Sequence, residues 1–323
     1  MRSRGLPDEL PQKLERDTPR EPGELATSQA ASRDRPAQSW HHSLVALVDV
    51  STLLDRIQAV CPLPSTAARV AQLSGDPKTR IDQIASILAT DPALAAEVMR
   101  IANSAAFGRS RQVSELEQAV LLIGAAQIHD MALAMGMLAA FRTKDELALS
   151  FHDRAVVAGS IARSLAEKLG VADKSEAFVC GLLSEIGAMA CAVVDATDYY
   201  RLWQEAGGDG EMRETLERER YAVTSRELGG KLLRRNGLPE AVARAVETDP
   251  ARADAAPRER LTGFARRAAA VIIEVAKSGD RSTLPDRLGA LRESLAIATP
   301  TEQLVEACVQ AAGTALSALR QAR

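Results

Sequence analysis

Residues 91–108 have the sequence DPALAAEVMRIANSAAFG, which contains the signals for one helix and for both of its ends. Asp91 offers a carboxylate to the unpaired amides of a first helical turn. Pro92 suits the first helical position, where its missing N–H costs nothing. Asn103 and Ser104 suit a cap followed by a tight turn. This stretch therefore predicts a helix that begins at an aspartate and ends at a turn.

The composition of the whole chain favours the same kind of structure. Of its 323 residues, 46% are hydrophobic and 26% are charged, whereas only 3% are aromatic. A β-sandwich usually needs aromatic and β-branched cross-strand pairs, so this scarcity disfavours an all-β fold. A chain of this length can bury one large core or two modest ones. The predicted fold class is therefore all-α, a multi-helix bundle in which an N-terminal lobe packs on a second helical lobe.

Apolar periodicity and cap residues predict a succession of helices along most of the chain. The first group spans roughly 45–59, 65–74, 80–89, 92–104, 115–123 and 126–142. The second group spans roughly 151–169, 174–194, 197–206, 211–219, 224–236, 239–247, 257–277, 284–295 and 300–321. Three capping boxes are predicted as well, namely Ser114 with Glu117, Thr224 with Glu227, and Thr299 with Glu302, where Pro300 takes the first helical position.

The predicted domain organisation follows from this pattern. Residues 1–42 are rich in proline and poor in bulky aliphatic side chains, which is typical of a disordered tail. The first helical group forms an N-terminal lobe at 43–142. The second group forms a helical lobe at 150–280, and C-terminal helices follow at 281–323.

Charge and hydropathy exclude several classes of function. The formal net charge of −3 and the pI near 5.9 give no electrostatic reason to expect nucleic-acid binding through phosphates. The apolar run Met131–Phe141 is shorter than the roughly 18 residues that a membrane-spanning helix needs. The N-terminus lacks the apolar region of a secretory signal. We therefore expect a cytoplasmic protein without membrane insertion.

The four cysteines point to the same compartment. Cys61, Cys180, Cys191 and Cys308 are widely spaced, lie in apolar helical surroundings and form no C-x-x-C pair. Such a pattern is not the framework of a disulfide-rich secreted domain. We expect four reduced thiols in the core.

Motifs for common catalytic chemistry are missing from the sequence. It contains neither a phosphate-binding glycine loop nor a G-x-S-x-G nucleophile elbow. Two His-Asp dipeptides occur, at 129–130 and 152–153, but metal-assisted hydrolysis needs several ligands that converge from different helices. With four histidines in the whole chain, a histidine-rich binuclear site cannot be assembled. We therefore predict no catalytic residues, no bound metal and no cofactor.

The chain resembles the HDOD domain, a family named for its relation to the HD phosphohydrolase fold, over roughly residues 50–275. The resemblance is carried by Pro62-Leu63-Pro64 ahead of a helix, by the 91–108 segment with the following stretch to Gly124, by the sequence GLLSEIG at 181–187, and by residues 227–239. It implies motif positions that we expect to be structural, namely Pro64, Asp91, Pro92, Leu94, Asn103, Ser104, Gly108 and Gly124.

The resemblance also marks where the chain departs from its hydrolytic relatives. HD phosphohydrolases, as a family, bind metal through a histidine on one helix, a His-Asp pair on a later helix and a distant aspartate. Here Ser184 and Glu185 replace the pair, and the upstream histidine position corresponds to Asp153 or its neighbour His152. Serine is a poor ligand for divalent metals, and one glutamate cannot organise a hydrolytic centre. The resemblance thus implies an HD-like lobe that has lost its metal, and a protein that is not an enzyme.

The function implied by this resemblance is that of a non-catalytic bacterial signal-transduction protein that acts through protein–protein interaction. We expect a signalling partner to bind a groove between the two lobes, near Asn103, Ser104, Ser184 and Glu185.

Two alternatives remain open. The first is a module that senses a cyclic dinucleotide or another nucleotide, because basic side chains outnumber acidic ones between residues 226 and 268. The second is a residual metal-dependent phosphohydrolase that uses His152, Asp153 and Glu185.

Overall fold

The computed structural model describes residues 49–76, 78–103, 113–141 and 146–321. Within these ranges all regular secondary structure is helical, which confirms the all-α prediction. The helices are α1 (Val50–Val60), α2 (Ser65–Gly75), α3 (Ile81–Leu88), α4 (Pro92–Ala102), α5 (Leu116–Ile123), α6 (Ala125–Ala140), α7 (Glu146–Leu169) and α8 (Lys174–Leu183). They continue with α9 (Ile186–Val194), α10 (Ala196–Ala206), α11 (Gly210–Tyr221), α12 (Ser225–Arg235), α13 (Glu240–Glu247), α14 (Pro257–Ser278), α15 (Leu284–Ser294) and α16 (Thr301–Gln321).

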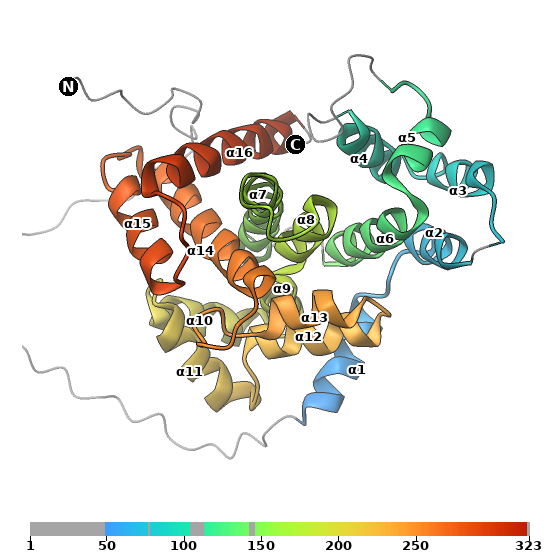
Figure 1. Cartoon of the computed structure of the whole chain (residues 1–323). Coiled ribbons are helices and arrows are strands. Elements are labelled where there is room, and N and C mark those ends of the chain that lie inside the picture. Colours follow the sequence, from blue (N-terminus) through green and yellow to red (C-terminus); the bar gives the residue numbers. More distant parts are fainter. Residues whose placement is uncertain (1–48, 77, 104–112, 142–145, 322–323) are drawn as a thin grey trace, which may run out of the picture.

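Helix α7 lies at the centre of the molecule, between the C-terminal helices α14 and α16 on one side and the α2–α6 group on the other (Figure 1). Small residues let the neighbouring helix α8 approach it closely. A Cβ added to Gly181 of α8 would lie only 2.6 Å from the carbonyl oxygen of Ala158 on α7. Only glycine allows the two backbones to come this near.

Two apolar clusters make up the core, and α7 contributes to both. The N-terminal half of α7, including Phe151, belongs to a cluster formed mainly by α1–α6 and α8–α13. Its C-terminal half, including Ile161, belongs to a second cluster with α14, α15 and α16. The first cluster contains residues from both sides of the expected lobe junction, such as Met131 and Met189. The two predicted groups of helices therefore share the first of these clusters.

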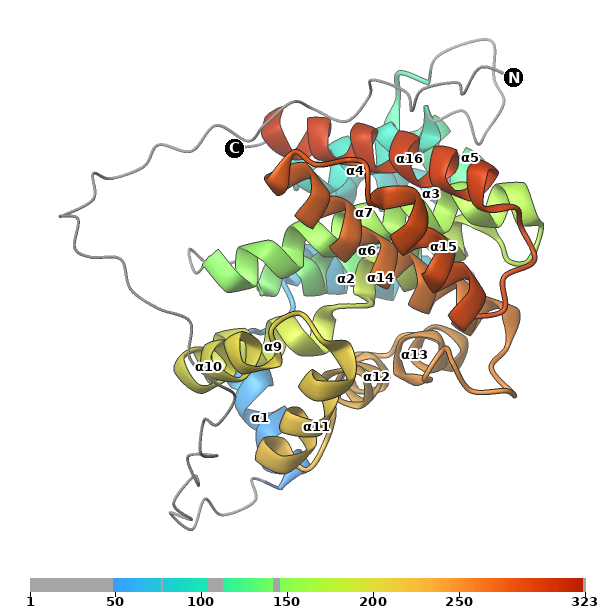
Figure 2. The same cartoon turned by 90° about the vertical axis from the view of Figure 1, so that its left-hand side faces the viewer.

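Helix α1 packs away from the helices that follow it in the sequence. Figure 2 shows it beside α9–α12, below the α2–α6 group. Asp55 of α1 pairs with Arg235 of α12, and the Arg56 guanidinium donates a hydrogen bond of 3.4 Å to the Val194 carbonyl at the end of α9. The first helix thus ties the N-terminal part of the chain to the second group of helices.

The structure tests several of the predicted local features. The Thr224–Glu227 capping box is confirmed at the start of α12. The Ser114–Glu117 box is wrong, because α5 begins at Leu116 and its N-cap residue Glu115 makes no side-chain cap hydrogen bond. All four cysteines are free and buried, as predicted.

A second apolar stretch, Lys174–Val194, is longer than the Met131–Phe141 run on which the membrane prediction rested. Its length and apolar composition would allow it to cross a membrane. Helices α5 and α6 are long and apolar enough only when taken together, and the two are bent by 106° relative to each other. In the structure 89% of the 174–194 window is buried inside the protein. A turn at Ser184 and Glu185 also divides it into α8 and α9. These features are typical of core helices in a folded domain.

Candidate functional site

The turn between α8 and α9 carries the two residues that stand where HD phosphohydrolases have their His-Asp pair. The sequence predicted one helix over 174–194, but the chain bends at Ser184 and Glu185. The Ser184 hydroxyl donates a hydrogen bond of 2.7 Å to the carbonyl of Gly181, one turn earlier. After the bend, Gly187 packs so closely on α12 that a Cβ there would lie 1.9 Å from the Ser225 carbonyl oxygen. A turn at Ser184 and Glu185 thus separates α8 from α9, and the close approach of Gly187 to α12 is a long-range contact that the apolar periodicity does not encode.

Glu185 is bound inside the protein by an arginine of the central helix. Its Oε1 lies 2.7 Å from Nη2 of Arg154 on α7, and the Glu185 side chain is only 1% exposed. The Arg154 guanidinium also lies 5.5 Å from the ring centroid of Phe151 and 5.2 Å from that of Trp203, within cation–π range. Burial lowers the pKa of Arg154, and the charge of Glu185 opposes that change. The carboxylate at the family's metal position therefore has a protein cation as its partner.

A second buried pair lies next to the first. Arg213 of α11 also lies over the ring of Trp203, 5.3 Å from its centroid, and its Nε is 3.5 Å from Glu217 Oε1. The Glu217 side chain is fully buried. It accepts hydrogen bonds from the Tyr199 hydroxyl at 2.8 Å and from the Ser225 amide at 2.7 Å. Burial, with the nearby carboxylate, raises the pKa of Tyr199, so this hydroxyl stays a donor.

A third pair and one further arginine complete the cluster. Arg226 of α12 binds Glu214 of α11 through two hydrogen bonds of 2.7 Å and donates a third, of 2.6 Å, to the Glu247 carbonyl. Arg266 of α14 is buried as well, at 6% exposure. The negative charges of Glu185 and Glu214 favour its protonated form. We call Arg154, Glu185, Arg213, Glu217, Arg226, Glu214 and Arg266 the buried ion cluster.

This arrangement does not fit a divalent metal. Among the described residues, no group of three or more His, Cys, Asp or Glu side chains is placed to hold a metal ion. Glu185 faces Arg154 rather than further carboxylates or imidazoles, and Ser184 uses its hydroxyl on the Gly181 carbonyl. The guanidinium of Arg154 lies 2.7 Å from Oε1 of Glu185, and a cation there repels a metal ion.

The expected upstream positions, His152 and Asp153, lie on α7 next to Arg154, and all three residues are partly exposed. Arg154 pairs with Glu185. On α14, where the sequence offers no aspartate, the buried charged residues are Glu259 and Arg266. A signal for both arginines was present in the sequence. Each lies at helical spacing from apolar residues of the core, such as Phe151 and Ala158 around Arg154.

The predicted partner-binding groove is wrong at Ser184 and Glu185. Ser184 is 4% exposed and Glu185 is 1% exposed, so a partner protein cannot contact these side chains in this conformation. Asn103 lies at the surface, but its side chain is engaged within the chain. Its Nδ2 donates to the Val113 carbonyl at 2.8 Å, and its Oδ1 accepts from the Val113 amide at 2.7 Å. Ser104 and Gly108 lie outside the described residues.

The other family-motif residues define helix ends and bends. Asp91 accepts a hydrogen bond of 3.0 Å from the Leu94 amide, as its predicted capping role requires, and Pro92 is the first residue of α4. Leu94 is buried. Pro64 is the N-cap residue of α2, and Gly124 joins α5 to α6 with a φ of 92°, which favours glycine.

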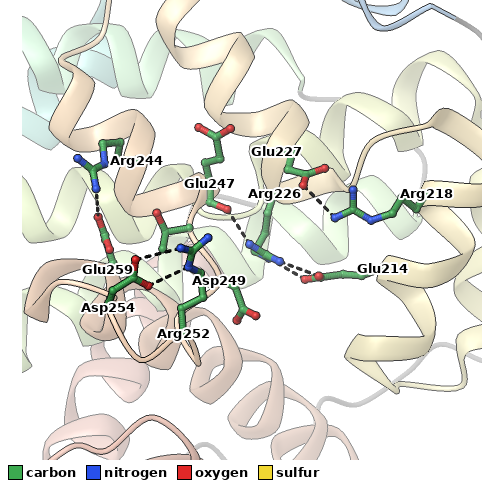
Figure 3. Close-up of a pocket in the computed structure, with 11 residues that line it drawn as sticks. Glu214, Arg218, Arg226, Glu227, Arg244, Glu247, Asp249, Arg252, Asp254 and Glu259 are labelled. Carbon is green, nitrogen blue, oxygen red and sulfur yellow. Dashed lines mark hydrogen bonds and ion pairs between the residues drawn. The ribbon is translucent and has the colours of Figure 1, made fainter.

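A large surface recess adjoins the buried ion cluster (Figure 3). It has a volume of about 550 Å³ and is lined by six carboxylates and four guanidiniums from α11 to α14 and the loop before α14. The arginines are matched to carboxylates, as in the pairs Arg218–Glu227, Arg244–Glu259 and Arg252–Asp254. The lining of this recess therefore carries paired charges of both signs.

Comparisons with known proteins agree with this architecture. A protein from Shewanella amazonensis SB2B that carries a provisional phosphohydrolase name superimposes with a TM-score of 0.60 at 21% identity, covering 82% of this chain and 97% of that one. An HDOD domain protein of unknown function from Geobacter sulfurreducens gives 0.53 at 20% identity, covering 85% and 98%. At this level of identity the likeness shows the fold alone.

The sequence comparisons identify the family. An uncharacterized protein of Treponema pallidum (strain Nichols) is 22% identical over 197 residues, which is 61% of this chain and 38% of that protein. The chain thus spans well under half the length of this relative. The model of the HDOD domain matches residues 60–250, more than half of the chain and including the buried turn at Ser184 and Glu185. The chain therefore belongs to the HDOD domain family.

Proposed function

We propose that this HDOD protein is a non-catalytic regulator that acts by binding a signalling protein. The observation that carries the proposal is the ion pair between Arg154 and Glu185, at the position where hydrolytic relatives hold metal. A fold whose hydrolytic centre has become a set of buried ion pairs offers its surfaces for function. We also propose a cytoplasmic location, supported by the four free, buried cysteines.

The non-catalytic part of the proposal is tested by elemental analysis and by a phosphodiesterase assay. The full chain is purified without added metal, its Mn, Fe and Zn contents are measured, and hydrolysis of bis-p-nitrophenyl phosphate is followed with added Mn²⁺. We expect metal far below one equivalent and no hydrolysis above the buffer rate. Metal near one equivalent that Glu185→Ala releases, and that a variant of the exposed Glu167 retains, would contradict the proposal.

The partner-binding part is tested by affinity purification of the tagged protein from its own cells, against a tag-only control. We expect one stoichiometric signalling protein, which is then purified separately and rebound to the full chain in a titration. Failure of the purified pair to bind would remove the support given by co-purification. If no protein co-purifies under cross-linking conditions, partner binding is refuted as the main activity under those conditions.

The nucleotide-sensing alternative receives no support from the charge arrangement, because the arginines of the recess are neutralised by carboxylates of the same recess. Thermal unfolding with and without a cyclic dinucleotide tests it. A ligand that binds only the folded state raises the apparent stability. We expect no saturable shift.

A further inference from the structure

A second recess lies where α1, α6 and α12 meet, between helices of the two predicted groups. It has a volume of about 260 Å³, and its walls are mainly apolar, with Ile57 from α1, Met137 from α6 and Leu232 from α12. None of the residues that line it is charged, in contrast to the recess beside the buried ion cluster. Apolar walls gain free energy when they lose contact with water, so this recess suits an apolar occupant.

Further apolar surface adjoins the recess. Val60, the last residue of α1, is 58% exposed and directly precedes Cys61, which lines the recess. Ala140 at the end of α6 also lines it and is partly exposed. An apolar segment that lies along the C-terminal half of α1 would cover these side chains together with the recess.

The segment that leads into α1 has a matching composition. Residues 43–48 read SLVALV, with four bulky aliphatic side chains and no charge. Residues 1–42 also contain only four such side chains, all of them leucine, although they are seven times as many. The segment 43–48 lies outside the described residues, and the described chain begins at Asp49. So dense an apolar run is expected to pack against the protein, because burial of each aliphatic side chain is favourable.

The direction and length of the chain allow this segment to reach the recess. Asp49 has φ −55° and ψ 132°, which is extended rather than helical, so the residues before it do not continue the axis of α1. Ile57 of the recess lies about 10 Å from Val50 along the helix, at 1.5 Å per residue. Leu44 can lie up to about 16 Å from Asp49 in an extended chain. A segment that turns back along α1 therefore spans the required distance.

We propose that residues 43–48 fold back along α1 and fill this recess with the side chains of Leu44 and Leu47. The contact covers the apolar seam between α6 and α12, and a protein that binds at this seam has to displace the segment first. The inference goes beyond the proposed partner binding and does not depend on it, because it concerns a contact within one chain.

The thiol of Cys61 reports on whether the recess is filled, because Cys61 lines the recess and is 9% exposed. The full chain is treated with iodoacetamide, and alkylation of each cysteine is followed by peptide mass spectrometry. Leu44→Asp with Leu47→Asp introduces two charges that an apolar recess cannot accommodate. We expect alkylation of Cys61 to become at least about tenfold faster in this variant, since the thiol is no longer covered.

The other three cysteines serve as internal controls for the fold. Cys180, Cys191 and Cys308 are at most 2% exposed, and their alkylation should stay unchanged. Leu10→Asp with Leu14→Asp, a leucine pair of residues 1–42, is the matched control and should leave Cys61 protected.

Three outcomes of this experiment overturn the proposal. The first is equal alkylation of Cys61 in the wild type and in the Leu44 and Leu47 variant. The second is an equal effect of the control pair. The third is protection of Cys61 that increases with protein concentration, because it would mean that a second copy of the chain fills the recess.

A second measurement changes the wall of the recess instead of the segment. Ala140→Glu places a charge in the lining, so chymotrypsin should cut after Leu44 and Leu47 at least about fivefold faster than in the wild type. Ala139→Glu changes the exposed neighbour on α6 and should leave the cleavage rate unchanged. If Ala140→Glu fails to fold, as judged by circular dichroism, Gln58→Glu in the lining from α1 replaces it. Equal cleavage in the wild type and the folded lining variant overturns the proposal.

Discussion

Nη2 of Arg154 lies 2.7 Å from Oε1 of Glu185, and the Glu185 side chain is 1% exposed. The pair joins the central helix α7 to the turn between α8 and α9, at the position that corresponds to the metal-binding pair of HD phosphohydrolases. A guanidinium thus balances the carboxylate that the fold buries there. This one contact gives the buried carboxylate a cation of the same chain as its partner.

Breaking the Arg154–Glu185 pair from one side should be strongly destabilising. Glu185→Gln leaves Arg154 without its carboxylate, and loss of one partner of a buried pair typically costs about 3–5 kcal/mol. Urea unfolding followed by circular dichroism measures the loss in the free energy of unfolding.

A double-mutant cycle separates the interaction energy of the pair from the other effects of the two substitutions. Arg154→Met with Glu185→Leu should cost less than the sum of the two single changes, with a coupling energy of about 1–3 kcal/mol. Strict additivity would show that the two side chains do not interact in the folded protein.

The hydrogen bonds between Asn103 and Val113 predict a structural role for this motif residue. The Asn103 amide makes both hydrogen bonds with the Val113 backbone, and thereby holds together two points ten residues apart. Asn103→Ala should lower the free energy of unfolding by about 1–3 kcal/mol, because it leaves the Val113 peptide without partners. It should also speed amide hydrogen exchange at Val113.

Asn103→Asp is the matched variant for this prediction. It keeps an acceptor for the Val113 amide but removes the donor to the carbonyl, so its loss should be smaller than that of Asn103→Ala. A stability equal to that of the wild type for both variants would contradict the structural role.

Gly187 should tolerate no side chain. A Cβ would lie 1.9 Å from the Ser225 carbonyl oxygen and 2.8 Å from the Gly229 amide nitrogen, and both are backbone atoms that a rotamer change cannot move away. Gly187→Ala should cost at least about 3 kcal/mol, at the upper end of overpacking effects. Gly210→Ala is the control, because nothing lies within 4 Å of its added Cβ. Equal melting temperatures for the two variants would refute the close contact of α9 with α12.

Asp130 gives a prediction for the effect of pH. Burial raises its pKa above the ordinary value of 3.8, and the nearby charge of Glu176 adds to the rise while His129 opposes it. The folded state therefore binds the proton more tightly than the unfolded state, so this contribution to stability is present at low pH. It is lost as the pH rises through the folded-state pKa.

Asp130→Asn removes this dependence. We expect the variant to be more stable than the wild type at pH 7, with the difference shrinking as the pH falls from the folded-state pKa toward 3.8 and staying constant below that. Urea unfolding at pH 3 to 7 measures it, with Asp153→Asn as the comparison. A difference that grows toward low pH would contradict the assigned direction.

Particular residues of the sequence predicted local features of the fold. Asp91 and Pro92 mark the start of α4, and Thr224 with Glu227 marks the start of α12, because caps depend on atoms within one helical turn. The Ser114–Glu117 box failed because its spacing also occurs by chance, and the chain at that point enters the helix two residues later. Burial of the four cysteines followed from their apolar neighbours.

The sequence by itself determined that the chain is helical and that residues 184 and 185 cannot serve as a His-Asp metal pair, since both follow from residue type and short spacing. Only the tertiary structure decided which side chain faces Glu185. Arg154 and Glu185 are 31 positions apart, and Arg266 lies far beyond both, so no local pattern predicts that they share one buried region. Their meeting depends on how α7, α9 and α14 pack, and packing is set by the contacts of the whole apolar core rather than by any one segment.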